Sequence, residues 1–172
     1  FFSFIAAAPE IMITVLKRPP TEYGYYFVMI PMGFMTGNYY ARYFGRSMEL
    51  NRMISIGASI GVFGISIAIA LQLIGFHQPI ALFAPVALAV FGNGIVLPNA
   101  QAAAINEFPN FAGSASGLTG FLQMFISGIA AQLAAAIFNG TVYPLLILML
   151  IASIFSIIVF NLGVQIKSKI PA

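Results

Sequence analysis

Long uncharged apolar runs are the feature that most limits how this chain can fold. Six such runs follow one another, and every charged residue except Glu10 lies between or beyond them. Charged residues make up 6% of the chain and hydrophobic residues 60%, whereas a soluble domain carries about a quarter charged residues. The chain lacks the polar surface that water requires, so we expect a membrane protein whose solvent is the lipid bilayer.

The runs have the lengths of membrane-spanning helices. We expect helices at residues 1–16, 23–41, 53–76, 80–104, 112–138 and 141–164. A spanning helix needs about 20 apolar residues, so the first run is short, and it begins without a start methionine or a polar flank. We therefore expect residues 1–172 to form one six-helix bundle that is a fragment of a longer protein.

Strands are the alternative to helices in a membrane. The strands of a membrane barrel alternate apolar and polar residues over segments of about ten, and residues 80–90 and 147–158 show no such alternation. The predicted fold class is an all-α membrane protein with six transmembrane helices.

Positive charges between the runs predict the orientation in the membrane. One side would hold Arg42, Arg46, Arg52, Lys167 and Lys169, and the other side Lys17 and Arg18. Because cytoplasmic loops are enriched in Lys and Arg, we expect the first group in the cytoplasm. The C-terminus of this integral, multi-pass protein would then be cytoplasmic.

Pairs of glycines predict close packing between helices. Glycines four residues apart lie on one helical face and let a neighbouring backbone approach. The pairs are Gly33 and Gly37, Gly57 and Gly61, and Gly113 and Gly117. Plain packing, without a role in transport, is sufficient to explain them.

A set of small, amide and proline residues in the second half resembles a known family. These residues are 94–100 (GIVLPNA), Pro109, 112–116 (AGSAS), Gly120 and 122–123 (LQ). They resemble the tenth-to-eleventh helix region of major facilitator superfamily transporters. Within that superfamily they look most like the bicyclomycin/chloramphenicol-resistance (Bcr/CflA) subfamily of drug:proton antiporters.

The resemblance implies both an architecture and an activity. The six runs would be helices seven to twelve of a twelve-helix protein, built as 3+3 inverted repeats, and the N-terminal six-helix half would be missing. The implied activity is proton-coupled efflux of drugs or other small lipophilic molecules across the bacterial cytoplasmic membrane by alternating access. The partners would be a small-molecule substrate, the bilayer and the missing half, with the proton gradient as energy source and no cofactor.

One loop departs from the family pattern. The cytoplasmic signature loop of these transporters has a glycine, an acidic residue close to an arginine, and then Gly-Arg. Residues 37–46 (GNYYARYFGR) contain no acidic residue, so an inward-closing salt bridge from this loop is in question. Arg42, Arg46 and Arg52 could equally determine topology and contact anionic lipid.

Glu10 is the only carboxylate within an apolar run. It lies seven residues before Lys17, or about 10 Å along a helix, which places it in the outer half of the membrane. An intramembrane acid is a candidate proton carrier or a partner for a cationic substrate. The alternatives are that it reaches toward the outer interface or contacts Lys17 or Arg18.

Amides and prolines interrupt the apolar runs. Asn93 and Gln123 lie near the middle of their runs, where each could hydrogen-bond a substrate in a cavity or bridge two helices. The matching 120–123 segment favours cavity lining for Gln123 only. Pro31 and Pro98 should bend their helices, and Asn99 is expected to satisfy carbonyl groups freed by the bend.

Aromatic and methionine side chains crowd the second run. Phe34 and Met35 are the members that we take as candidates for substrate contact, because a polarizable, flexible wall suits varied lipophilic molecules. Contact with lipid explains such residues equally well.

The residue inventory does not suggest catalysis or a metal site. The chain has no cysteine and no aspartate, and its one histidine, His77, falls in a turn on the side opposite the 113–117 serines. We expect no enzyme, no metal ion and no nucleic-acid binding. Two other functions remain open, which are a facilitator importing a small metabolite and a non-transporting six-helix scaffold.

Overall fold

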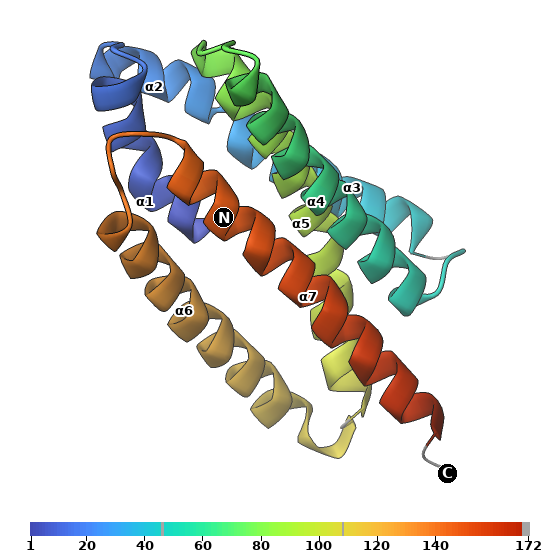
Figure 1. Cartoon of the computed structure of the whole chain (residues 1–172). Helices are drawn as coiled ribbons and strands as arrows, with labels where there is room; N and C mark the ends of the chain where they lie inside the picture. Colours follow the sequence, from blue (N-terminus) through green and yellow to red (C-terminus); the bar gives the residue numbers. More distant parts are fainter. Residues whose placement is uncertain (46, 108, 170–172) are drawn as a thin grey trace.

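The structure, a computed structural model, describes residues 1–45, 47–107 and 109–169. The described part contains helices and no strand, as the sequence predicts (Figure 1). The elements are α1 (Phe2–Glu10), the π-helical turn η1 (Ile11–Val15), α2 (Pro20–Phe27), α3 (Met29–Phe44), α4 (Leu50–Leu73), α5 (Pro79–Glu107), the 3₁₀ turn η2 (Pro109–Phe111), α6 (Ala112–Ala136) and α7 (Tyr143–Lys169).

Within residues 1–45, 47–107 and 109–169, four helical segments are long and apolar enough to cross a membrane. They are Leu50–Leu73, Pro79–Glu107, Pro109–Ala136 and Tyr143–Ile166. A shorter apolar helix covers Phe2–Val15. The last four predicted runs therefore have the length of spans, and a total of six spans stays a prediction.

The second predicted run is divided at Val28. The sequence predicts one helix over 23–41, whereas the structure has α2 and α3 separated by this residue. Pro31 supplies the physical reason, because it has no amide hydrogen for the Phe27 carbonyl one turn earlier. The amide of Val28 still bonds the Gly24 carbonyl, at a long 3.3 Å, so the chain changes direction without leaving the helical conformation.

Helix α5 is the centre of the bundle and packs most extensively against α4 and α3. The α4–α5 approach depends on glycine. A Cβ atom built at Gly57 would lie 2.7 Å from the carbonyl oxygen of Gly92, closer than real Cβ contacts. One at Gly61 would meet only the Ala89 oxygen, at 3.9 Å, so the two members of this pair differ in how tightly they pack.

The α3–α5 approach uses the first glycine pair. Cβ atoms at Gly33 and Gly37 would collide with the backbone carbonyl groups of Ala87 and Phe91. The third pair, in α6, is different, since nothing lies within 4 Å of a Cβ built at Gly113 or Gly117.

The remaining helices pack around this three-helix group. Helix α1 packs against α6, and α4 packs against α7, whereas α1 and α7 share few contacts. The buried core joins α1, α5 and the start of α7, with Phe4, Phe83 and Leu146 having no exposed surface. Helix α6 is mostly exposed and lies along the edge of the bundle (Figure 1).

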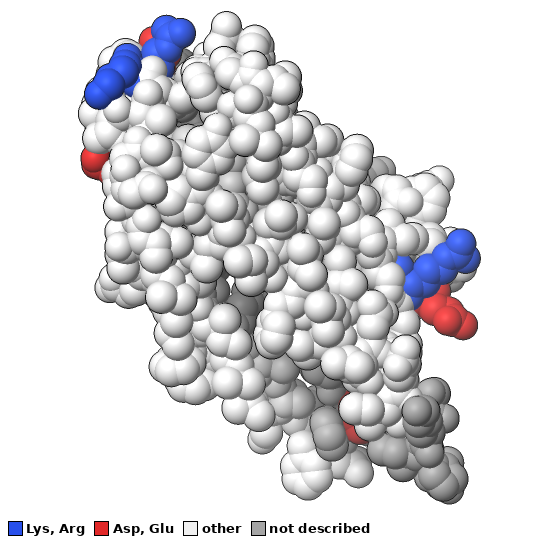
Figure 2. Space-filling view, in the orientation of Figure 1, with Lys and Arg blue, Asp and Glu red and all other residues white. Residues whose placement is uncertain are grey.

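Apart from Glu10, the charged residues that the structure describes lie in or beside the turns between helices. Figure 2 shows basic side chains at two separated places on this face, with an uncharged surface between them. Arg18 pairs with Glu22, with 4.0 Å between Nη1 and Oε2, near the α2 start. An uncharged band between charged ends is the surface that a bilayer requires.

Candidate functional site

A cavity of about 360 Å³ lies between α4, α5, α6 and α7, beside the first residues of α1. Figure 2 shows the surface hollowed between α6 and α7. The walls are mostly apolar and small, and their polar atoms come from a few amides and hydroxyls. A mostly apolar pocket with few convergent polar groups is typical of a binding site for an organic molecule.

Two amides face this cavity from different helices. Asn93 comes from α5 and Gln123 from α6. Neither side chain has a hydrogen-bond partner within the described ranges. Because an unpaired amide at membrane depth is costly, these two groups define where a polar partner is needed.

Phe34 lines the same cavity, and Met35 does not. The Phe34 ring stacks on that of Phe1, with 6.4 Å between centroids and 14° between planes. Met35 is 68% exposed on the outward side of α3. The two neighbouring candidates from the sequence are therefore placed on different surfaces.

Glu10 is exposed at the last residue of α1 and is not part of the cavity wall. Its carboxylate makes no ion pair within the described residues, and its backbone carbonyl accepts a 2.6 Å hydrogen bond from Thr14. The π-helical turn η1 starts directly after Glu10. Such turns are frequent at functional sites. The structure does not test whether Glu10 carries a proton or contacts a substrate, so this role stays a prediction.

Two arginines of the predicted cytoplasmic loop, Arg42 and Arg52, are exposed. Arg42 lies in the last turn of α3 and Arg52 in the first part of α4. Neither forms an ion pair within the part of the chain that the structure describes. Arg46 lies outside the described residues.

Asn99 is buried beside Pro98 in an α5 that runs unbroken through this proline. Its Nδ2 donates a 2.7 Å hydrogen bond to the Ile95 carbonyl. Pro98 has no amide hydrogen for the Gly94 carbonyl, four residues earlier, whereas Asn99 bonds the neighbouring Ile95 carbonyl. The expected role of Asn99 at a freed carbonyl therefore stays a prediction.

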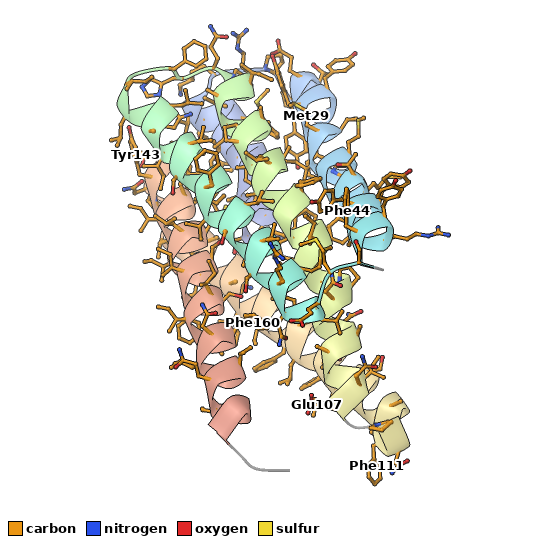
Figure 3. All side chains as sticks on the ribbon, turned by 90° about the vertical axis from the view of Figure 1, so that its right-hand side faces the viewer. Met29, Phe44, Glu107, Phe111, Tyr143 and Phe160 are labelled. Carbon is orange, nitrogen blue, oxygen red and sulfur yellow. The ribbon has the colours of Figure 1, made fainter. Side chains whose placement is uncertain are left out.

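The sequence reasoning missed a polar cluster at the other end of α4. Gln72 is 1% exposed, and its Oε1 lies 2.9 Å from Nδ1 of His77. The Tyr143 hydroxyl donates to the Gln72 backbone carbonyl at 3.2 Å. Figure 3 places Tyr143 at the start of α7, beside α4, so the cluster joins the α4–α5 turn to α7. The sequence offered one signal for this cluster, which is the amide of Gln72 within the apolar run 53–76.

The cavity also contains hydroxyls that the sequence reasoning did not single out. Ser127 of α6 and Ser153 and Ser156 of α7 line it. The Ser153 hydroxyl donates to the Met149 carbonyl at 2.8 Å. A serine within a helix commonly pairs its hydroxyl hydrogen in this way, with the carbonyl four residues earlier. Within the described residues, no group of three or more His, Cys, Asp or Glu could hold a metal ion.

These features define an all-helical integral membrane protein whose bundle contains a cavity that opens at its surface. Over 161 residues, 92% of its length, the chain is 26% identical to the "Bicyclomycin resistance protein homolog" of Haemophilus influenzae. The chain spans 40% of the length of that protein. No protein-family model and no solved structure matches the chain.

Proposed function

We propose that this chain is the C-terminal half of a secondary active transporter that exports drugs or other small lipophilic molecules in exchange for protons. The observation that carries the proposal is the similarity to a bicyclomycin resistance protein over 92% of the chain. The four long apolar helices support it, because a transporter of this kind is polytopic. Because the chain covers 40% of the relative, the existence of an N-terminal half is itself part of the proposal.

The proposed mechanism is alternating access. The bundle would rock against the N-terminal six-helix half and expose the space between the two halves to each side of the membrane in turn. Protons moving inward would drive export, and no enzymatic step or cofactor is involved. We place the protein in the bacterial cytoplasmic membrane with the C-terminus in the cytoplasm.

Two surfaces of the chain are proposed to serve transport. Met35, which is exposed on α3, would contact lipophilic substrate at the interface with the N-terminal half, and Phe34 would contact substrate from the cavity wall. Glu10, an exposed carboxylate within an apolar segment, would carry a proton or contact a cationic substrate.

The test is drug accumulation in bacterial cells that lack their own exporters and express the full-length gene. We expect lower accumulation of several lipophilic antibiotics than in cells with an empty vector, and a protonophore should restore it. Uptake of a polar metabolite without any drug effect would favour a facilitator-type importer. Transport of neither class, with the protein correctly inserted, would favour a non-transporting scaffold.

A further inference from the structure

Helix α4 ends in a turn that folds back over its last residues. Gly75 has a φ of 84°, a conformation that glycine adopts without steric cost. Its amide donates to the Gln72 carbonyl at 3.1 Å, and the amide of Phe76 donates to the Leu71 carbonyl at 3.0 Å. These two hydrogen bonds form a Schellman motif. The motif returns the chain toward the helix end, and the ring of His77 lies beside Gln72.

The buried side chain of Gln72 contacts the ring of His77. Gln72 is 1% exposed, and its Oε1 lies 2.9 Å from Nδ1 of His77. Its Nε2 has no hydrogen-bond partner within the described residues, and an unpaired buried group of this kind is costly. The Tyr143 hydroxyl bonds the backbone carbonyl of Gln72, which any residue would supply. Of these contacts, the one with His77 is therefore the one that needs the amide side chain.

The charge of His77 determines the strength of this contact. Histidine is the side chain whose charge ordinarily changes between about pH 5 and 8. A charged ring has an N–H on both nitrogens, so Nδ1 donates to Oε1 in a charge-assisted hydrogen bond, which is stronger than a neutral one. A positive charge is also favourable at the C-terminal end of a helix. A neutral ring has neither advantage, whether it donates from Nδ1 or accepts from a reoriented amide.

His77 is exposed, so its ring can exchange protons with the surrounding water. It forms no ion pair within the part of the chain that the structure describes. The turn before α2 and the start of α7 lie toward the same end of the bundle (Figure 1). The titratable and charged residues of those segments are Glu10, Lys17, Arg18, Glu22, Tyr23, Tyr25, Tyr26 and Tyr143. A test must therefore separate His77 from these groups by variants that change the histidine alone.

We propose that Gln72, Gly75 and His77 form a proton-sensitive latch at the end of α4, in which charged His77 donates to Gln72 and stabilises the α4–α5 turn. The stabilisation is present at low pH and is lost as the pH rises and the ring loses its proton. Because the Gln72 carbonyl also accepts from Tyr143, a looser turn weakens the contact with the start of α7. The latch depends on the fold alone, and the proposed orientation places it outside the cytoplasm.

The test is hydrogen–deuterium exchange of the full-length protein in mild detergent, at about pH 5.5 and about pH 8, which bracket the titration of histidine. Each rate is divided by that of an unprotected amide at the same pH. The amides of Gly75 and Phe76 report on the latch, because they donate the two hydrogen bonds of the turn. We expect several-fold greater protection of these amides at the lower pH. In His77→Gln, whose side chain does not titrate, protection should be equal at the two pH values.

Two further variants are matched controls. His77→Gln combined with Gln78→His moves the histidine by one exposed position and leaves the composition unchanged, so it should show no pH dependence. Gln72→Leu removes the acceptor together with the unpaired Nε2, and a leucine has a similar size. We expect this variant to fold, to keep the Schellman turn and to lose the pH dependence.

Four results overturn the latch. They are equal protection at the two pH values in the parent protein, and the parent's pH dependence retained in His77→Gln, in Gln72→Leu or in the variant with the shifted histidine. Amide protection does not depend on transport. A protein with the latch that exports no drug would therefore contradict the proposed function alone, and a drug exporter without the pH dependence would contradict the latch alone.

Discussion

The α4–α5 contact allows a stability difference between two neighbouring glycines to be worked out. Gly57 and Gly61 lie one turn apart on α4, and each is changed to alanine. The new Cβ at position 57 would lie 2.7 Å from the Gly92 oxygen, where 3.4–4 Å is ordinary contact. The two helices must therefore separate by about 1 Å, and close-packed interiors do not absorb such shifts freely.

The expected magnitude follows from the cost of overpacking, which is typically about 1–3 kcal/mol. Alanine favours a helix over glycine by up to about 1 kcal/mol, and this gain is common to both variants. Gly61→Ala should be neutral or slightly stabilising, because its Cβ meets only an oxygen at 3.9 Å. Gly57→Ala should be less stable than Gly61→Ala by about 1–3 kcal/mol.

The assay is equilibrium unfolding of the full-length protein in mild detergent, with the two variants and the parent protein measured side by side. A denaturant midpoint that falls for Gly57→Ala and holds for Gly61→Ala is the expected result. Midpoints equal to that of the parent protein for both variants would refute the close approach of α4 and α5 at Gly92. A fall of both would mean that the helices approach closely along the whole pair.

Three further substitutions should lower the stability of the full-length protein in the same assay. Asn99→Ala removes the hydrogen bond to the Ile95 carbonyl and should cost about 0.5–1.5 kcal/mol; no loss would show that lipid or water replaces it. Tyr143→Phe removes the hydroxyl that bonds the Gln72 carbonyl, with a similar expected cost. An unchanged midpoint would show that this hydrogen bond does not stabilise the contact between α4 and α7. Phe4→Ala empties a fully buried site and should cost about 3–5 kcal/mol, so a loss below 1 kcal/mol would place Phe4 outside the core.

The sequence predicts helix positions well because bilayer thickness limits apolar run lengths. The run expected at 112–138 is Ala112–Ala136, and the run expected at 80–104 starts at Pro79. The division of the second run at Val28 was not predicted, although the Pro31 responsible for it was marked as a bend. A proline in the sequence indicates that a helix is disturbed nearby. The exact residue at which the chain turns depends on the packing around the proline.

The faces of the helices could not be predicted, and the cavity depends on them. A helix that is apolar all round gives no periodic signal for its buried side. The spacing of two glycines identifies a helix face, but it does not show which helix packs against that face. The pairs that begin at Gly57 and Gly113 have the same spacing, yet Gly57 is tightly packed and Gly113 is open. Gln123 and Asn93 were distinguished in the sequence, and the structure brings both to one cavity.

The measurement that tests the proposed exporter most directly is drug-dependent proton flux in energised inverted vesicles that contain the full-length protein. Proton release from the vesicle lumen on adding lipophilic drugs is the expected result, and Glu10→Gln should reduce it if Glu10 couples protons to transport. Unchanged flux in Glu10→Gln would remove that residue from the machinery. No proton movement with any drug, in vesicles that contain inserted protein, would contradict proton-coupled export.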